Sequence, residues 1–576
     1  MAFYLSPLVD INEIDLTTTI PAVATNIAVI VLRSAYKGPE LKRTLVTTKD
    51  ELVDKFGDPT TRAECYEDML SAIGYLKYGT QLYCTRAMPT NATFSGTKGV
   101  SGAQSTFTQF NTSNAYKMSD FDSDDPDQFA AEASFGTEEM QFIANSRGDW
   151  GNYVRIGIVD YSTYNAMVSA GSYSTWDTYD VIAGIDSPMV DAKDFLVIVQ
   201  VQDQGETSFA TKEVWNVSTS TTRRDDQGQI TFCENIINEQ SNYIRMALKT
   251  ANKNADIVMS TSEWQNFSGG QDSSDVYVAD TVTDAIVIEA LDFYENSEEI
   301  DVNIFIDSDK GTAAKRHMIT ICESRKDCIA LIDCDRGDVV SNRGNEATDL
   351  RTWRRVTFNE NTSYAALYGN WLEVYDRWAG QYRWVPSSGY VAGILANTDD
   401  VADPWWAPAG LNRAILTSVR KLAWNPSLGE RNTLYQNGIN PIVSFSGQGK
   451  VIWGQKTLLD KSSAFNRINV RRLFVILEKA ISTAVKYFLF EPNDEFTRLS
   501  LINMIDPYLR DVKARRGIYD FMVVCDGRNN TAERIDRNEL WVDLYIKPVR
   551  AAEFIVLNFI ATKTGASFEE IITGAA

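Results

Sequence analysis

Stretches with the apolar pattern of strands alternate along the chain with stretches that have the spacing of helices, and the first 90 residues contain both. Residues 1–22 are β-prone, contain two prolines and lack helical periodicity, so we expect an extended N-terminal arm. A mostly apolar run at 22–32 predicts a buried strand. Residues 47–57 place apolar side chains three and four positions apart between a Thr N-cap and a closing Gly57, which predicts a short helix. With the second helix and the strand that follow, residues 23–90 are a predicted first part of the core.

The pattern changes between residues 91 and 265, where Ser, Thr, Asp, Gly and Tyr dominate. Short alternating runs in this stretch predict a β-rich insertion, which divides near Asn145 if it consists of two subdomains. From 266 to 460 the predicted helices and strands alternate again, which is typical of a layered α/β core. The sequence therefore predicts a multidomain protein of the α+β or α/β class, whose core is interrupted by the insertion.

The C-terminal part is predicted as a domain over 461–550 followed by an arm over 551–576. Residues 469–490 carry one apolar stripe at helical spacing and form the strongest helix candidate of the chain. Residues 539–548 alternate apolar and polar positions, which predicts a half-buried strand.

The last strand candidate, residues 554–562, reads FIVLNFIAT and is apolar on both faces except at Asn558. Such a strand needs cover on both sides, and as a free edge it would promote aggregation. It can close the final sheet of its own chain, or it can add to the sheet of a neighbouring copy. We favour exchange between copies, because the chain also has an extended N-terminal arm. The predicted subunit-exchange interface comprises Leu5, Val9, Ile11, Ile14, Leu16, Leu540, Val542, Leu544, Ile546, Phe554, Ile555, Val556, Leu557, Phe559 and Ile560.

Charge and composition narrow the classes of function. The chain of 576 residues has a formal net charge of −22, which argues against wrapping nucleic acid, because phosphate binding needs clustered cations. Residues 91–270 hold 11 Lys and Arg against 24 Asp and Glu, so the insertion is strongly acidic and is expected to face solvent. No apolar run reaches the ~18 residues of a membrane span. The N-terminus also lacks the features of a signal peptide, so we expect a protein made in the cytoplasm without membrane insertion.

Candidate chemistry is sparse. The seven cysteines are widely spaced without a C-x-x-C pair, so we expect reduced and mostly buried thiols. His317 is the single histidine, and it lies on a predicted helix with no nucleophile motif nearby, so we expect a surface or packing role. Residues 444–451 approach a phosphate-binding loop but have Ser444 and Val451 where that motif requires Gly and Ser or Thr. We therefore predict a glycine-rich turn there.

Two further groups allow alternative interpretations. Asp333, Asp335 and Asp338 could offer oxygen ligands to a metal, but they lack the EF-hand spacing and its closing Glu. Eight of the 13 tryptophans lie between residues 353 and 453, where they could form a stacking platform for carbohydrate or bases, or fill a core or subunit interface. We favour packing. No catalytic constellation emerges, so we predict no enzyme activity, no cofactor and no metal.

Several stretches in order along the chain resemble one known family: VTTKDELVDKFGDP and YLKYGTQLYCTRA, then GDWGNYVRIGI at 148–158, FSGGQDS at 267–273, and VPSSGYVAGILANTDDVADPWWAPAGLNRAIL with NGINPIVSFSGQGKVIWGQKTL further on. They resemble the tail sheath proteins of contractile-tailed bacteriophages, close to those of T4-like myoviruses. The resemblance covers most of the chain. This sequence departs from the family pattern at residues 368–371 and 454–458.

The resemblance implies a structural subunit and its partners. Sheath proteins stack as six-fold rings in a helix around a tail tube, between a baseplate and a tail terminator, and they exchange terminal arms that complete a sheet in a neighbour. Contraction drives the tube through the host envelope for genome ejection, which would place this protein in a virion assembled in the host cytoplasm. The alternative is the sheath of a bacterial contractile injection particle such as an R-type bacteriocin. A glycan-binding or enzymatic tail component is a more remote alternative.

Overall fold

The structure is a computed structural model of the chain. It describes residues 25–59, 63–100, 107–110, 115–121, 129–136, 138–170, 189–225, 227–257, 261, 263–272 and 282–557. The described residues fall into two compact units, one ending at Leu489 and one beginning at Phe490. The predicted N-terminal arm, with Leu5, Val9, Ile11, Ile14 and Leu16, lies outside the described residues, as do Phe559 and Ile560.

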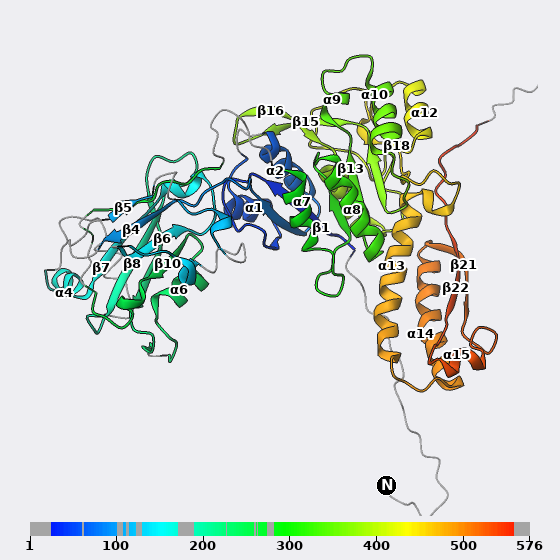
Figure 1. Cartoon of the computed structure of the whole chain (residues 1–576). Helices are drawn as coiled ribbons and strands as arrows, with labels where there is room; N and C mark the ends of the chain where they lie inside the picture. The colour runs from blue at the N-terminus through cyan, green and yellow to red at the C-terminus, as the bar shows by residue number, and fades with distance from the viewer. Residues whose placement is uncertain are drawn as a thin grey trace, which may run out of the picture. The chain divides into compact units, whose positions relative to one another are not determined.

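A seven-stranded sheet forms the centre of the larger unit (Figure 1). It is parallel except for its last strand. Its order is β18 (Ile439–Asn440), β14 (Ala365–Tyr368), β13 (Ile329–Asp333), β12 (Ile304–Ile306), β1 (Ile27–Arg33), β3 (Gln81–Ala87) and β2 (Thr44–Val46). The short apolar runs of β1, β12, β13 and β14 suit a parallel sheet buried on both faces.

Helices cover both faces of this sheet and bury its alternate side chains. On one face, Ala28, Ile30 and Leu32 pack with residues of α1 (Lys49–Phe56), α2 (Ala63–Tyr75) and α11 (Ser388–Val401). On the other face, Val29 and Val31 pack with α7 (Asp284–Asp292) and α8 (Thr312–Arg325). The remaining core helices are α9 (Arg336–Val339), α10 (Glu346–Thr352), α12 (Leu428–Gln436) and α13 (Ile468–Val485).

Two small sheets extend the core beyond β14. One is formed by β15 (Trp371–Asp376), β16 (Gln381–Pro386) and β17 (Lys421–Leu422), and the other is the hairpin of β19 (Ile442–Phe445) and β20 (Gly449–Ile452). The turn of that hairpin is the predicted glycine-rich turn, and Gly447 and Gly449 both adopt positive φ there.

The insertion is β-rich, as the alternating runs of the sequence predicted, and the structure shows two sheets in it. One sheet has the order β10 (Ile244–Leu248), β6 (Glu138–Ala144), β4 (Gly96–Val100), β5 (Phe107–Gln109). The other has the order β11 (Gln265–Asn266), β7 (Val154–Asp160), β8 (Asp194–Val201), β9 (Ala210–Ser218). Helices α3 (Phe129–Glu132), α4 (Tyr161–Ala170) and α6 (Cys233–Gln240) accompany them. Residue 145 separates strands of different sheets, yet both sheets contribute to one buried cluster, so they share a core.

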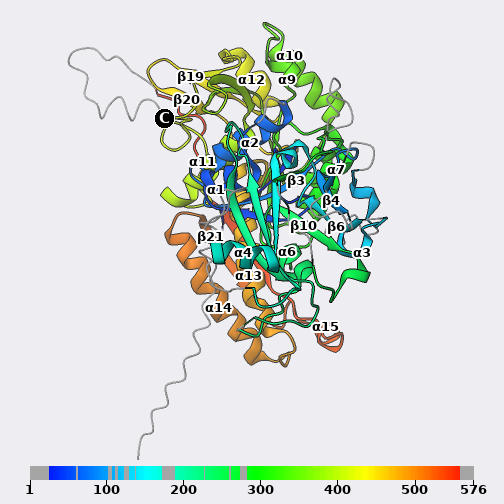
Figure 2. The ribbon, with the colours of Figure 1, turned by 90° about the vertical axis from the view of Figure 1, so that its left-hand side faces the viewer.

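The smaller unit is built from helix α14 (Glu495–Ala514), strand β21 (Ile518–Val524), the short helix α15 (Ala532–Asp536) and strand β22 (Asp543–Pro548). Helix α14 begins at the N-cap Asp494, whose Oδ1 accepts a hydrogen bond from Thr497 N at 2.8 Å. It lies beside the β21–β22 hairpin in both views (Figures 1 and 2). None of the helices in the described ranges is long and apolar enough to cross a membrane.

Candidate assembly surface

The β21–β22 hairpin of the smaller unit is a sheet with one half-buried apolar face. The register sets Phe521 opposite Ile546 and Val523 opposite Leu544, and all four side chains are only partly buried. Among the described residues this sheet has only these two strands. A two-stranded sheet is marginally stable by itself and gains stability from further strands or from a helix that covers it.

The opposite face of the hairpin carries a second, exposed set of large side chains. Met522 and Tyr545 are direct neighbours across the ladder, and both are more than half exposed. Asp520 lies opposite Lys547 in the same register, which pairs opposite charges across the strands. This face is therefore amphipathic and open to a partner.

The chain continues from the hairpin into the predicted exchange strand. Residues 551–557 form no ladder with any other segment in the described part of the chain. Phe554 is 85% exposed and Val556 81%, and Ile555 and Leu557 are also largely exposed. Four consecutive exposed apolar residues are unusual on a monomer and are typical of interaction sites.

The remaining predicted interface residues lie in or beside the hairpin. Leu540, Val542, Leu544 and Ile546 are all half-buried, while the alternate residues Trp541, Tyr545 and Lys547 are exposed. The predicted alternation is thus present except at Asp543, which is half-buried, and the strand itself begins at Asp543 rather than at residue 539.

The residues that were candidates for chemistry contact other side chains or lie in the core. His317 lies on the surface of α8, with its Nε2 2.6 Å from Asp292 Oδ1. Of the eight clustered tryptophans, Trp353, Trp371, Trp405 and Trp424 are buried, which supports the packing interpretation for those four.

The aspartates considered as metal ligands are not equivalent. Asp333 is fully buried, and its Oδ1 accepts hydrogen bonds from the backbone N–H groups of Ser387 and Ser388, each at 2.8 Å. It thereby binds the N-terminal end of α11. Burial and the neighbouring Asp307 raise the pKa of Asp333 to about 7.

Sequence reasoning missed a buried charge cluster at the carboxyl ends of β1 and β12. Asp68 of α2 accepts hydrogen bonds from Arg33 Nε at 2.9 Å and from Lys310 Nζ at 3.0 Å, and all three side chains are buried. Strand order reverses between β1 and β12, and ligands of open α/β sheets bind at such a point. In this protein the side chains of Arg33, Asp68 and Lys310 occupy that point. A sequence signal existed, because the apolar runs of β1 and β12 both end in a charged residue, Arg33 and Asp307.

Solved structures show the class to which this fold belongs. A crystal structure of a sheath tail protein from Listeria innocua matches with a TM-score of 0.55 and 13% sequence identity, over 92% of this chain and 93% of that chain. The helical sheath of the anti-feeding prophage in its contracted state matches with a TM-score of 0.50 and 15% identity, over 97% of this chain and 100% of that chain. At these identities the likeness concerns the fold alone, and it shows a multidomain α/β fold that this chain shares with the two proteins.

Sequence comparisons then give the family. Residues 285–458 match the family described as the phage tail sheath protein central domain, and residues 460–562 match the phage tail sheath C-terminal domain. The tail sheath protein of Vibrio phage KVP40 is 34% identical over 456 residues, and that of Enterobacteria phage T4 is 41% identical over 310 residues. The chain therefore carries both the central and the C-terminal domain of phage tail sheath proteins.

The matches cover only part of each relative. They amount to 74% of this chain and 65% of the KVP40 protein, and to 51% of this chain and 47% of the T4 protein. The chain thus spans between about half and two thirds of the length of these relatives. The resemblance found in the sequence motifs is confirmed at the level of the family.

Proposed function

We propose that the protein is a structural subunit of a contractile phage tail sheath, which polymerises as stacked six-fold rings around a tail tube and contracts to drive the tube through the host envelope. In this proposal it acts without catalysis and belongs to the virion after assembly in the host cytoplasm. Its partners are other copies of itself, the tube protein, and the baseplate and terminator proteins. The two matched sheath domains and the sheath-like fold support the proposal.

One observation carries the assembly part of the proposal. The smaller unit has an incomplete sheet with a half-buried apolar face, and the same chain continues into four exposed apolar residues without a ladder partner in the described ranges. A strand donated from one copy to the sheet of another would satisfy both. Each main-chain hydrogen bond of the donated strand contributes ~0.5–1.5 kcal/mol net. Each large apolar side chain that becomes fully buried adds about 1.5–3 kcal/mol.

Strand donation from one copy to the next is a heterologous contact, and such contacts build rings or open helices. That geometry suits a helical sheath. In this proposal the subunit is organised as an N-terminal arm, a core interrupted by an outward-facing acidic insertion, a C-terminal domain and an exchange arm. The proposed ranges are 1–22 for the N-terminal arm, 23–90 and 266–460 for the core, 91–265 for the insertion, 461–550 for the C-terminal domain and 551–576 for the exchange arm.

Contraction in this proposal needs no hydrolysis. Subunits would move as rigid bodies from a metastable lattice into a denser one with more buried contact. Links at residues 17–21 and 547–552 would absorb the rotation while the exchanged strands keep neighbouring copies connected. The first of these links lies outside the described residues.

The proposal is tested by changing one exposed residue of the exchange strand. Val556→Asp places a charge where a neighbour's sheet would bury a valine, so we expect loss of polymerisation in electron micrographs. Val401→Asp is the matched control, because Val401 is also an exposed valine, at 68%, but lies in the larger unit. Deletion of residues 551–576 should likewise abolish polymers while leaving the circular dichroism of the monomer unchanged. Normal polymers from both Val556→Asp and the deletion would refute strand donation.

A further inference from the structure

A buried ion triad lies at the root of the insertion. Arg86 is the penultimate residue of β3 in the core, Arg147 follows β6 in the insertion, and Glu40 belongs to the core loop between β1 and β2. The three side chains are 0%, 4% and 2% exposed. The triad therefore joins two bodies, the core and the insertion. Glu40 of the core and Arg147 of the insertion are 107 positions apart in the sequence.

The carboxylate of Glu40 bridges the two arginines. Its Oε1 accepts hydrogen bonds from Arg86 Nη1 at 3.1 Å and from the backbone N–H of Arg147 at 2.6 Å. Its Oε2 accepts from Arg147 Nε at 2.8 Å. Glu40 thus holds both the side chain and the main chain of the insertion at Arg147.

Backbone carbonyls complete the surroundings of the arginines. Arg86 Nε donates to Ala35 O at 2.9 Å within the core, and Arg86 Nη2 donates to the carbonyl of Arg147 at 2.9 Å. Arg147 Nη1 donates to Pro89 O at 3.1 Å, in the segment that leads from the core into the insertion. The next residue, Gly148, has φ of +127° and a Cβ there would lie 2.6 Å from Asp272 Oδ1, so the backbone after the triad is also fixed.

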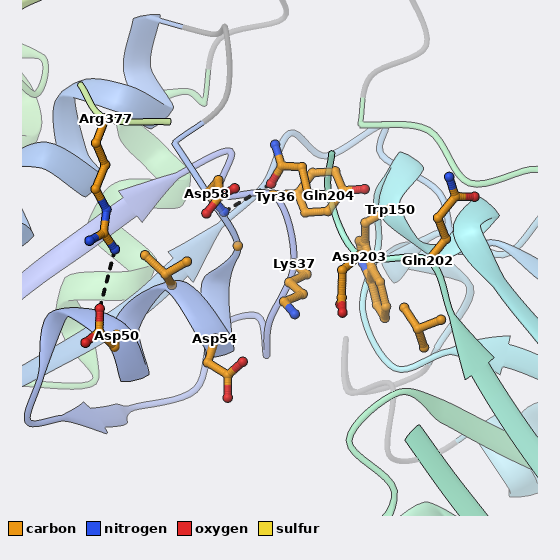
Figure 3. A pocket seen from close by; sticks show the side chains of 13 residues that line it. Tyr36, Lys37, Asp50, Asp54, Asp58, Trp150, Gln202, Asp203, Gln204 and Arg377 are labelled. Atoms are coloured by element: carbon orange, nitrogen blue, oxygen red, sulfur yellow. Dashed lines mark hydrogen bonds and ion pairs between the residues drawn. The ribbon is translucent and has the colours of Figure 1, made fainter. Parts of the chain in front are cut away.

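A cleft of about 240 Å³ is lined by residues of both the core and the insertion (Figure 3). It is linked to the triad through Tyr36, whose carbonyl accepts a hydrogen bond from Arg86 Nη2 at 3.3 Å. Asp50, Asp54 and Asp58 line it from the core, and Gln202 to Gln204 line it from the end of β8 in the insertion. The side-chain Oε1 of Gln204 accepts a hydrogen bond from the backbone N–H of Asp58 at 3.0 Å. Tyr36, which also lines the cleft, packs against the buried cluster of the insertion.

Stability alone does not explain two cations and one anion in such a buried position. Removing charges from water is expensive, and apolar residues of similar volume often stabilise a fold as well or better. A buried ion network with directed hydrogen bonds does specify one arrangement of the parts that it joins, because any other arrangement leaves charges unpaired. The triad combines this directionality with a position where Arg86 of the core, Arg147 of the insertion and the entry segment at Pro89 meet.

We propose that Glu40 is a positioning residue that fixes the orientation of the insertion on the core, so that the two bodies move as one rigid piece. The insertion is then not a hinged flap, and any rearrangement between subunits carries it along unchanged. The fixed orientation is a property of the isolated subunit and does not depend on the proposed sheath function.

The test is a distance measurement by pulsed electron paramagnetic resonance on the full chain. Nitroxide labels on cysteines introduced at Gln240 in the insertion and Glu323 in the core report the orientation, and both positions are exposed. The seven native cysteines are buried, so labelling is selective. The wild-type protein should give one narrow distance peak. Glu40→Gln should broaden that peak, because the neutral amide no longer holds both arginines.

Two controls separate positioning from stability. Asp68→Asn also removes a buried carboxylate from between two cations, Arg33 and Lys310, but lies within the core, so it should leave the distance peak narrow. Glu40→Gln combined with Arg147→Met removes one of the two cations left unpaired, which should recover part of the stability while the distance peak stays broad. A broad or double peak in the wild-type protein, or a narrow peak in the combined variant, would overturn the proposal.

Discussion

Asp68→Asn should be among the most destabilising single changes in the core. The Asp68 carboxylate accepts hydrogen bonds from Arg33 N at 2.7 Å, Arg33 Nε at 2.9 Å, Arg33 Nη2 at 3.0 Å and Lys310 Nζ at 3.0 Å. The amide removes the carboxylate to which both buried cations donate hydrogen bonds, and it offers only one accepting oxygen. Breaking a buried ion pair from one side costs about 3–5 kcal/mol, so we expect a loss of that size in the free energy of unfolding.

Equilibrium urea unfolding followed by tryptophan fluorescence measures this loss, because eight of the 13 tryptophans lie between residues 353 and 453 in the core. Glu360→Gln is the control, since Glu360 forms an exposed pair with Arg316 at 2.9 Å. Exposed pairs contribute about 0–1 kcal/mol, so this variant should be close to wild type. Adding Lys310→Met to Asp68→Asn should recover part of the loss. If Asp68→Asn is no more destabilising than Glu360→Gln, the reasoning about the buried charge cluster is wrong.

Two further predictions concern the core. Burial, with Asp309 nearby, raises the pKa of Glu67 from its ordinary value of 4.5 to about 8. Between these values the folded protein holds a proton that the unfolded chain has lost, so the free energy of unfolding should fall as pH rises through this window. Glu67→Gln should flatten that part of the pH profile of urea unfolding, and an unchanged slope would contradict the assignment. Trp371→Ala should cost about 3–5 kcal/mol in the same assay, because the indole is fully buried. Its Nε1 also donates to Cys334 O at 3.0 Å. A loss below that of Trp371→Phe would contradict a packing role.

Local sequence signals predicted the elements that depend on neighbouring residues. The helix predicted near residue 48 is α1, in which Thr48 Oγ1 accepts from Glu51 N at 3.2 Å and Gly57 closes the helix with φ of +80°. The apolar stripe at 469–490 contributes Val470, Leu477, Ile481 and Ala484 to the buried residues of α13, although the α-helix ends at Val485 and a 3₁₀ turn follows. These features follow from capping and periodicity within one segment.

Features that join distant segments could not be predicted in this way. Sequence periodicity treats Arg472 as a polar position, but it is buried and its Nη2 lies 2.6 Å from Asp399 Oδ2, 73 residues away. The pairing of β10 with β6 and the contact of Glu40 with Arg147 each cross about 100 residues. Such partners depend on topology, and one sequence holds no local signal for them. The candidate exchange strand could be proposed from the sequence because its apolar character on both faces is itself local.

The half-buried hairpin of the smaller unit also affects when a subunit becomes fully stable. Before assembly, β21 and β22 have little cover, so their amides should open locally at a lower free energy than those of the seven-stranded sheet. A neighbouring strand that binds only the closed hairpin would stabilise it in proportion to the logarithm of subunit concentration. Folding of this unit and growth of the polymer would then be one linked equilibrium, in which each added copy completes the folding of the copy before it.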